Sequence, residues 1–395
     1  MQKSLFVVVD KFSERVLDFD NVTLYDYGLF ETVTSFDNLY DIYTGAYSGY
    51  GNIDQISVKT PDLVGGFYQV TPDADSSYLI DFDLTGNSGN FTDLLGNPAS
   101  YTDMYRYTWT DQSDETIHNS FKLLESARPT AVNLSWALKR VFNKIINLPK
   151  NARFIKAIEE ANLISEEDIW MCSKIGDNGL EIIKGIYSNR SLENKNKPIN
   201  ILTHCNAGWL ATVDWGTALS PIYKAHREAL NIHVWVDETR PRNQGSSLTA
   251  YELNGEGIPN TVIVDNAGGH LMQNGLVDLV IVGCDRATSS GDICNKIGTY
   301  LKALAAKDNK IPFYAALPAS TIDWEIDNGV GYINIENRSS QEVSHISGPD
   351  ENGDIHKIRV VPKNCKCLNP GFDVTPSRLI TGIITEKGIC KANKE

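Results

Sequence analysis

The chain has 395 residues, of which 42% are hydrophobic and 22% are charged, and its formal net charge at pH 7 is −14. This length is enough for two or three domains, each with a hydrophobic core of its own. It contains no run of about 18 consecutive apolar residues, which excludes an α-helix that spans a membrane. It also lacks a basic stripe, so the charge distribution argues against a nucleic-acid partner.

The charges divide the chain into two parts of different character. Residues 1–120 contain five basic and 19 acidic side chains, whereas the remaining 275 residues contain 31 of each sign. Eleven of the 17 tyrosines also lie in residues 1–120. We therefore expect an acidic N-terminal part that differs from the rest of the chain.

The N-terminus and the cysteines indicate the compartment. The first apolar stretch is short and lacks a small-residue cleavage site, so no signal peptide is predicted. The seven cysteines are odd in number and scattered, which is typical of reduced thiols. Cys365 and Cys367 have the wrong spacing for zinc and no partner pair, so they predict no metal site. We expect a cytoplasmic protein.

The first part of the chain has the pattern of antiparallel strands. Residues 77–84 and 105–109 alternate apolar and polar side chains, and turn-forming residues 85–90 lie between these runs. Period-two alternation separated by glycine and asparagine predicts β structure. We assign residues 1–115 to an atypical, acidic, β-rich N-terminal domain.

From about residue 117 the apolar residues follow the spacing of helices. Pro129 and Thr130 are suited to begin a helix. The predicted helices cover residues 131–140, 152–161 and 166–187. We assign residues 116–190 to a helical segment.

After a polar linker at residues 188–198, strand-like and helix-like stretches alternate. The predicted strands are 199–203, 233–236, 261–264, 279–282 and 313–316. The predicted helices between them are 218–230, 249–255, 268–274 and 296–307. Short loops between strands and helices are typical of a parallel sheet with helices on both faces. We expect residues 191–395 to form a Rossmann-like α/β catalytic domain whose mostly parallel strands end at one edge.

Two of these strands are followed by side chains that can exchange protons. Cys205 follows the strand 199–203, and Asp285 follows the strand 279–282. Small turn-forming residues after Cys205 suggest an open loop, in which a thiol near a helix N-terminus would have a lowered pKa. The alternatives are an inert buried cysteine and an Asp285 that forms a salt bridge with Arg286. Together the two strand ends predict an acid/base pair in one cleft.

Two further groups of polar residues are candidates for ligand binding. The segment Asp-Glu-Thr-Arg-Pro at residues 237–241, followed by Gln244 and Gly245, either orients a sugar hydroxyl or braces neighbouring loops. Asn295 and Lys296 begin the next predicted helix, where free N–H groups and an ammonium suit an anion; the alternative is a solvated lysine in a first turn. Neither Gly-x-Gly-x-x-Gly nor Gly-Lys-Ser/Thr occurs, which argues against dinucleotides and ATP.

Seven segments together resemble a known family. They are Ala-Arg-Pro-Thr-Ala-Val-Asn-Leu (127–134), Thr-His-Cys-Asn-Ala-Gly (203–208), Val-Asp-Glu-Thr-Arg-Pro (236–241), Gln-Gly (244–245), Gly-Cys-Asp-Arg (283–286), Asn-Lys-Ile-Gly-Thr-Tyr (295–300) and Asn-Pro-Gly-Phe-Asp-Val-Thr-Pro (369–376). They closely resemble methylthioribose-1-phosphate isomerase, whose family includes regulatory subunits of the translation initiation exchange factor and ribose-1,5-bisphosphate isomerase. The cysteine and the Gly-x-Asp-Arg strand end favour the enzyme over the regulatory relatives. The resemblance covers about residues 121–390.

The resemblance implies an aldose–ketose isomerase, an intramolecular oxidoreductase that converts 5-methylthioribose 1-phosphate to 5-methylthioribulose 1-phosphate in methionine salvage, without a metal or nucleotide cofactor. It implies that Cys205 shuttles a proton between sugar carbons and that Asp285 acts at the ring oxygen and hydroxyl. If a hydride moves instead, an apolar wall matters more than a base. A homodimer is also implied. The residues expected to hold the phosphate and sugar hydroxyls are Arg128, Gln244, Asn295 and Lys296.

The chain departs from the family at one motif. Members carry an Arg-Gly-Ala-Pro segment, upstream of the helix that follows Arg128, whose arginine and backbone bind the phosphate; this chain has no such segment. Loss of a bidentate arginine–phosphate contact would cost about 2 to 5 kcal/mol of binding unless another donor replaces it.

Three alternatives stay open. The substrate could be 5-deoxyribose 1-phosphate, because nothing in the sequence reports the substituent on the fifth carbon. The protein could be a non-catalytic regulatory relative that senses a phosphosugar or a nucleotide. The acidic N-terminal domain could mediate assembly and have no role toward the sugar.

Overall fold

The computed structural model of this chain describes residues 56–60, 63–72, 78–83 and 113–393. The chain divides into two compact units. The first comprises residues 1–118 and 145–159, and the second comprises residues 119–144 and 160–395. The predicted strand at residues 105–109 lies outside the described residues.

The described strands of the first unit form an antiparallel sheet in the order β1-β2-β3. They are β1 (Ile56–Thr60), β2 (Leu63–Pro72) and β3 (Tyr78–Asp83). Tyr68 in β2 lies opposite Ile56 in β1 and Phe82 in β3. The alternation at residues 77–84 therefore predicted a strand correctly, and its antiparallel pairing is confirmed.

Within the described part of the chain, three helices precede the larger sheet. They are α5 (Asp114–Ser126), α6 (Val132–Ile145) and α7 (Lys150–Ser188). The sequence predicted separate helices over residues 152–161 and 166–187, but α7 is continuous because the stretch between them contains neither proline nor glycine. Arg140 of α6 pairs with Glu160 (Nε to Oε1, 2.6 Å) and with Glu167 (Nη2 to Oε1, 3.0 Å), two turns apart on α7. Among the described residues, no helix combines the length and apolar character needed to cross a membrane.

A seven-stranded sheet forms the centre of the second unit, in the order β16-β15-β10-β7-β4-β5-β6. In chain order its strands are β4 (Ile199–Thr203), β5 (Ile232–Asp237), β6 (Asn260–Ile263), β7 (Leu279–Val282), β10 (Phe313–Ala316), β15 (Gly382–Thr385) and β16 (Gly388–Cys390). All pairings are parallel except that of β15 with β16. The predicted α/β fold with a mostly parallel sheet is confirmed.

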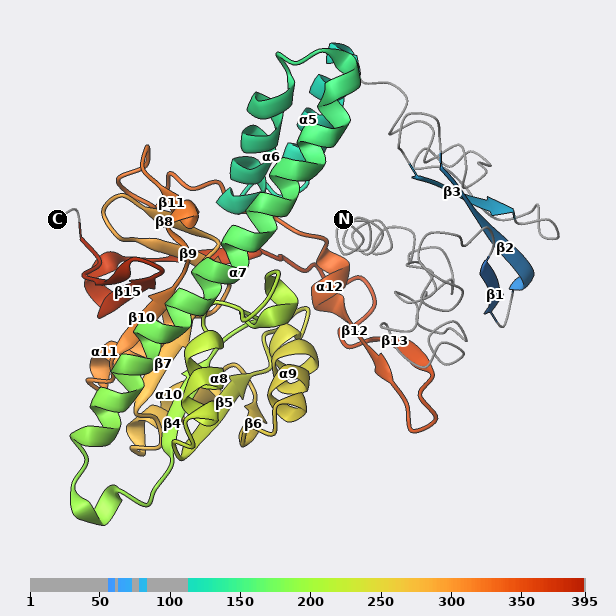
Figure 1. The fold of residues 1–395 in the computed structure, drawn as a ribbon. Helices are drawn as coiled ribbons and strands as arrows, with labels where there is room; N and C mark the ends of the chain where they lie inside the picture. Colours follow the sequence, from blue (N-terminus) through green and yellow to red (C-terminus); the bar gives the residue numbers. More distant parts are fainter. Residues whose placement is uncertain (1–55, 61–62, 73–77, 84–112, 394–395) are drawn as a thin grey trace. The chain divides into compact units, whose positions relative to one another are not determined.

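Helices cover both faces of this sheet. On one face, α8 (Ser220–Arg227), α9 (Ala250–Gly255) and the part of α7 in the second unit pack against side chains such as Ile201 and Ile281. On the other face, α10 (Ala267–Gln273) and α11 (Thr299–Asp308) pack against Leu202 and Val280. Figure 1 shows α7 and α8 lying across one face of the sheet. Successive strand residues therefore enter different cores, as the alternation of side chains along a strand requires.

A smaller sheet in the order β11-β8-β9-β14 carries the residues that follow β7. Its strands are β8 (Arg286–Thr288), β9 (Ile293–Lys296), β11 (Ile322–Asp323) and β14 (Phe372–Thr375). The prediction of a helix over residues 296–307 was wrong at its start, because α11 begins at Thr299. Asn295 and Lys296 stay extended since they pair with Asp373 and Phe372 of β14, a strand that no local pattern reveals.

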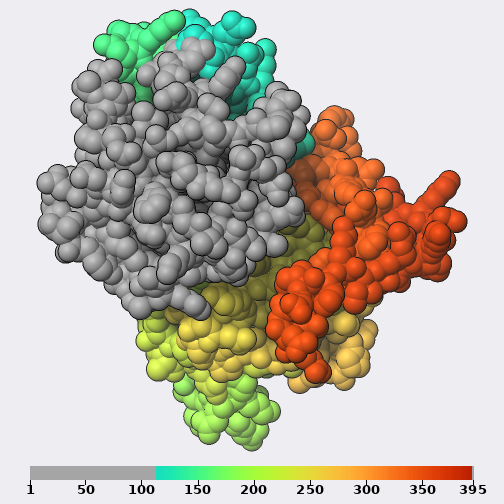
Figure 2. Space-filling view, turned by 90° about the vertical axis from the view of Figure 1, so that its right-hand side faces the viewer, coloured from blue at the N-terminus to red at the C-terminus, as the bar shows by residue number. Residues whose placement is uncertain are grey.

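A hairpin follows the short helix α12 (Ser340–Ser344). It consists of β12 (His345–Pro349) and β13 (Ile355–Arg359), with His345 opposite Arg359. Every residue of β13 is exposed. Figure 2 shows this region of the second unit, in red-orange, projecting from the surface. The hairpin is therefore separate from the packed layers that surround the main sheet.

The parallel strands end at one edge of the main sheet. Thr203 at the end of β4 lies opposite Val236, and Asp237 at the end of β5 lies opposite Ile263. Strand β7 is the other neighbour of β4. The residues that follow β4, β5 and β7 therefore emerge side by side, which is where open α/β sheets bind their ligands.

We predict that Ile201→Ala lowers the free energy of unfolding by about 2 to 5 kcal/mol, because Ile201 is fully buried in β4 and its truncation leaves a cavity. Urea denaturation measures the change. Leu301→Ala on α11 is the matched control, since Leu301 is 60% exposed, and its loss should stay within about 0.5 kcal/mol. Equal losses in the two variants would contradict the packing described here.

Candidate active site

Cys205 lies just beyond the end of β4, where the chain leaves the sheet. Its backbone φ is 67°, a left-handed conformation that is uncommon for residues other than glycine. Its N–H donates to Oγ1 of Thr239 at 2.8 Å, and its carbonyl accepts from Oγ1 of Thr249 at 2.7 Å. Side chains, rather than the sheet, therefore hold the backbone of this turn.

The loop after Cys205 surrounds the carboxylate of Glu252, which is fully buried on α9. The donors to this carboxylate are Nδ2 of Asn206 (2.8 Å), the N–H groups of Trp209 (2.9 Å) and Leu210 (3.1 Å), and the hydroxyl of Tyr223. A Cβ at Gly208 would lie 1.6 Å from Oε2 of Glu252, so this approach requires glycine. One buried charge thus shapes the loop that follows the candidate thiol.

Asp285 follows β7 and lies beside Arg128. Its Oδ1 is 3.7 Å from Nη2 of Arg128, and its backbone carbonyl accepts from the N–H of Val132 at the start of α6. The predicted alternative, a salt bridge between Asp285 and Arg286, is wrong, because Nη1 of Arg286 lies 2.9 Å from Oδ2 of Asp323. The carboxylate of Asp285 is therefore not used to brace its neighbour in the chain.

The chain around Arg128 is held by two side chains from other elements. Arg286 donates to the carbonyls of Thr130 (2.9 Å) and Pro129 (3.1 Å). The N–H of Thr130 donates to Oε1 of Glu336 at 3.3 Å. These contacts keep the half-exposed guanidinium of Arg128 next to Asp285.

Lys296 and Asn295 are neighbours in β9, so their side chains point to opposite faces. Lys296 is only 8% exposed, and its Nζ lies 4.4 Å from the centre of the Phe372 ring. The amide of Asn295 instead donates to Oγ1 of Thr299 at 3.0 Å. The predicted anion-binding position is therefore a buried ammonium on a strand and not a helix N-terminus. The side chain of Asn295 points to the opposite face of β9 from that of Lys296.

Gln244 directly precedes a single π-helical turn, η3 (Gly245–Thr249). A Cβ at Gly245 would lie 1.7 Å from the carbonyl oxygen of Asp237, so this position also requires glycine. Oε1 of Gln244 is buried and has no hydrogen-bond partner among the described residues. Because a buried acceptor is normally satisfied, this oxygen is suited to accept a hydroxyl of a ligand.

Burial determines the protonation of the thiol and the carboxyl. Burial raises the pKa of Cys205 to about 11, although the charges of Lys296 and Arg128 lower it and that of Asp285 raises it. The expectation of a lowered pKa was therefore wrong, because withdrawing a thiolate from water outweighs the nearby cations. Burial also raises the pKa of Asp285 above its usual range, with Lys296 and Arg128 opposing the shift and Glu336 adding to it.

The charges of Arg128 and Lys296 act on both Cys205 and Asp285, which places the four side chains close together at the carboxyl edge of the sheet. The thiol holds its proton at neutral pH, and the carboxyl can give and accept one. The two cations can balance the charge of an anionic ligand. The arrangement is suited to moving protons on a small, negatively charged substrate.

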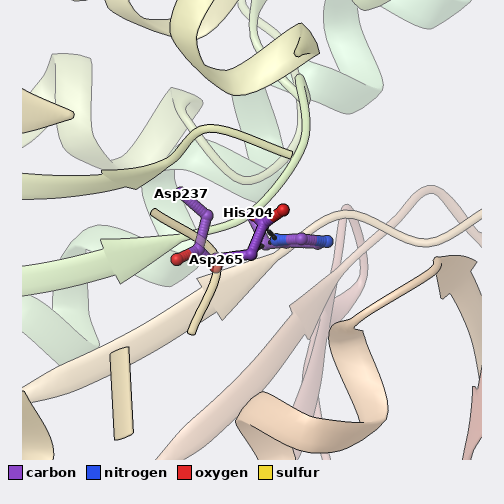
Figure 3. Close-up of side chains that lie close together, drawn as sticks. All are labelled: His204, Asp237 and Asp265. Atoms are coloured by element: carbon purple, nitrogen blue, oxygen red, sulfur yellow. Dashed lines mark hydrogen bonds and ion pairs between the residues drawn. The ribbon is translucent and has the colours of Figure 1, made fainter. Parts of the chain in front are cut away.

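His204, Asp237 and Asp265 form a cluster with the spacing of a metal site. Figure 3 shows their side chains lying close together. Nδ1 of His204 lies 2.9 Å from Oδ2 of Asp237, and Nε2 lies 2.8 Å from the carbonyl of Ile297. Nζ of Lys302 is 3.2 Å from the same carboxylate oxygen. Both ring nitrogens are engaged and an ammonium is already present, so the cluster does not fit a metal ion and instead joins the strand ends.

Four residues that shape this site were not among the predicted site residues. Thr239 lies in the segment 237–241 that the sequence had singled out, so its hydroxyl could have been found there. Thr249 and Glu252 are three residues apart and share a helix face, but no pattern links that face to Cys205. Glu336 belongs to a distant loop whose approach to Thr130 requires the fold.

Known proteins match this chain in sequence and in structure. The model of the initiation factor 2 subunit family matches residues 97–392. A methylthioribose-1-phosphate isomerase from Methylocella silvestris is 57% identical over 300 residues, which cover 76% of this chain and 81% of that protein. The structure of 5-methylthioribose 1-phosphate isomerase from Pyrococcus horikoshii matches with a TM-score of 0.58 and 30% identity, covering 87% of this chain and 94% of that one. Subunit delta of translation initiation factor eIF-2B from A. fulgidus matches with a TM-score of 0.55 and 38% identity, covering 70% and 75%.

We predict that alkylation of Cys205 accelerates about tenfold per pH unit and levels off only near pH 11, because burial raises the pKa of this thiol to about 11. Lys296→Met should raise this pKa further, since the ammonium lowers it, and should slow alkylation at any fixed pH. Peptide mass spectrometry measures the extent of alkylation at Cys205. Alkylation of the exposed Cys365 in the same sample serves as the control for the reactivity of the reagent. A plateau below pH 9 at Cys205 would contradict the burial.

Proposed function

We propose that this chain, which belongs to the initiation factor 2 subunit family, is an aldose–ketose isomerase that converts 5-methylthioribose 1-phosphate to 5-methylthioribulose 1-phosphate. The observation that carries the proposal is that Cys205 and Asp285 follow the neighbouring strands β4 and β7, with Arg128 3.7 Å from Asp285 and the charge of Lys296 acting on both groups. The 57% identity to a methylthioribose-1-phosphate isomerase supports this choice of substrate.

The reaction breaks one ring bond and moves two protons. The ring oxygen and C1 each gain a proton, whereas C2 and its hydroxyl each lose one. The phosphate remains on C1 throughout, so the ring cannot open to a free aldehyde. Two groups that each carry one proton between two positions are therefore sufficient.

We assign one of these transfers to each of the two groups. The carboxyl of Asp285 donates a proton to the ring oxygen as the bond from C1 to that oxygen breaks, and it later takes the proton of the C2 hydroxyl. Cys205 removes the proton from C2 and delivers it to C1. The raised pKa of Asp285 favours its starting role as an acid.

The thiol must first release its proton to solvent, because only the thiolate can remove a proton from carbon. It regains a proton from solvent after it has delivered the abstracted one to C1. With a pKa of about 11, roughly one thiol in ten thousand is ionised at pH 7. Lys296 and Arg128 favour the ionised form, and so does the positive charge that ring opening leaves at C1. In the competing route a hydride moves directly from C2 to C1, and no thiolate is required.

The phosphate and hydroxyls require donors and acceptors at fixed positions. We propose that Arg128 and Lys296 bind the phosphate. Oε1 of Gln244, which has no partner within the described part of the chain, would accept a sugar hydroxyl. Asn295 would act from the other face of β9 by holding Thr299.

The cellular location, the oligomeric state and the domain roles are proposed as follows. We propose a cytoplasmic homodimer that acts in methionine salvage. We also propose that residues 1–115, 116–190 and 191–395 serve as an acidic β-rich domain, a helical segment and the catalytic domain.

A regulatory role is the second candidate, because subunit delta of translation initiation factor eIF-2B is 38% identical over the matched region. A regulatory protein of this fold would bind a phosphosugar or nucleotide without turning it over. Ligand-induced thermal stabilisation without any product, tested with the sugar phosphate and with nucleotides, would favour it. Parallel kinetics with 5-deoxyribose 1-phosphate would decide whether the methylthio group is required.

We predict that Cys205→Ala and Asp285→Asn each lower kcat for 5-methylthioribose 1-phosphate by about a thousandfold, because each removes one proton carrier. Ketose formation in a coupled assay measures the loss. Cys365→Ala is the matched control, since this thiol is exposed, and its kcat should stay within about twofold of the unmodified protein. Unaltered turnover in Cys205→Ala would end the proposed mechanism.

We predict that substrate carrying deuterium at C2 loses part of the label to solvent during one turnover. A thiol that holds the abstracted deuteron can exchange it with water before delivery to C1. Mass spectrometry of the ketose formed in single-turnover conditions reports the retained label. Complete retention at C1 would contradict the shuttle and support hydride transfer.

A further inference from the structure

The left-handed backbone of Cys205 must be maintained by its surroundings. A non-glycine residue with φ of 67° is strained and persists only where neighbouring groups determine it. The residue stands at the point where β4 ends, so its N–H and carbonyl have left the sheet ladder. Something else must satisfy both groups if the conformation is to be held.

Two threonine hydroxyls perform this task from opposite sides. Oγ1 of Thr239 accepts the N–H of Cys205 at 2.8 Å and itself donates to the carbonyl of Asp237 at 3.1 Å. Oγ1 of Thr249 donates to the carbonyl of Cys205 at 2.7 Å and accepts from Nδ2 of Asn206 at 3.2 Å. Each hydroxyl therefore donates one hydrogen bond and accepts another, and one of these two bonds is to the backbone of Cys205.

Both threonines are fully buried and are held on separate elements. The N–H of Thr239 donates to Oδ1 of Asp265 at 2.8 Å, which fixes it beyond the end of β5. Thr249 ends the π-helical turn that begins at Gly245. Because Gly245 has no side chain, this turn approaches the carbonyl of Asp237 closely enough to bring Thr249 toward Cys205.

We propose that Thr239 and Thr249 are positioning residues that hold Cys205 in its left-handed conformation and thereby direct its sulfur toward Asp285 and Lys296. We call the two hydrogen bonds from Thr239 and Thr249 to the backbone of Cys205 the clamp. The role of the sulfur in turnover rests on the proposed function, whereas the clamp is inferred from these contacts alone. Relaxation of residue 205 into an ordinary conformation would reorient its Cβ and carry the sulfur away from the reacting carbons. A displacement of about 1 Å is enough to cost a hundredfold in rate.

The kinetic test removes the hydroxyls without changing side-chain shape. Thr239→Val and Thr249→Val should each lower kcat by about tenfold to a hundredfold while KM changes by less than about threefold, because the phosphate-binding side chains stay in place. Thr239→Ser and Thr249→Ser keep the hydroxyl and should restore most of kcat. Failure of the serine variants to rescue kcat, or a loss that appears only in KM, would overturn the positioning role.

A matched control comes from strand β15, which β10 and β7 separate from β4 in the sheet. Thr385 at the end of β15 is buried, accepts the N–H of Lys387 at 3.1 Å and donates to the carbonyl of Gly388 at 3.1 Å. Thr385→Val removes the same pair of contacts away from Cys205 and should leave kcat within about twofold. A loss of kcat equal to that of Thr239→Val would overturn the proposal.

A stability test separates the clamp from the proposed reaction. Because φ is positive at residue 205, Cys205→Gly should unfold about 2 °C above Cys205→Ala. This difference should shrink when Thr239→Val and Thr249→Val are both present, since the backbone is then free to relax. An unchanged difference would overturn the clamp. Absence of isomerase activity in the unmodified protein would overturn the proposed function and leave this result intact.

Discussion

The site depends on the partial burial of a thiol and a carboxyl at the carboxyl edge of a parallel sheet. Burial raises the pKa of both Cys205 and Asp285, so each group retains its proton more readily than it would in water. Lys296 and Arg128 oppose these shifts and keep the ionised forms accessible. The same two cations can bind a phosphate, so Lys296 and Arg128 can serve both in substrate binding and in setting the pKa values of the proton carriers.

This arrangement is maintained by contacts between parts of the chain that are distant in sequence. The buried carboxylate of Glu252 organises the loop after Cys205. His204 joins the end of β4 to Asp237 and to the carbonyl of Ile297, next to Lys296. The acid/base pair is thus supported from several strand ends, and a packed sheet with fixed register supplies the rigidity that such precision needs.

Local patterns in the sequence predicted much of the fold. The bounds of β4, β7 and β10 match the prediction, because each is a short apolar run bounded by polar or turn-forming residues. The placement of Cys205 and Asp285 beyond neighbouring strands followed from the same patterns. Lys296 was assigned to a helix because its pairing with β14 depends on residues more than seventy positions later. The pKa of Cys205 was misjudged because the partial burial that raises it is a property of the packed molecule and not of the flanking residues.

In the proposed enzyme, one phosphorylated pentose lies between Cys205 and Asp285. The most direct measurement is a crystal structure of the Cys205→Ser protein with 5-methylthioribulose 1-phosphate bound. We expect C1 and C2 of the sugar to face residue 205, the C4 hydroxyl to face Asp285, and the phosphate to lie against Arg128 and Lys296. Sugar carbons turned away from residue 205, or a ligand bound elsewhere in the protein, would contradict it.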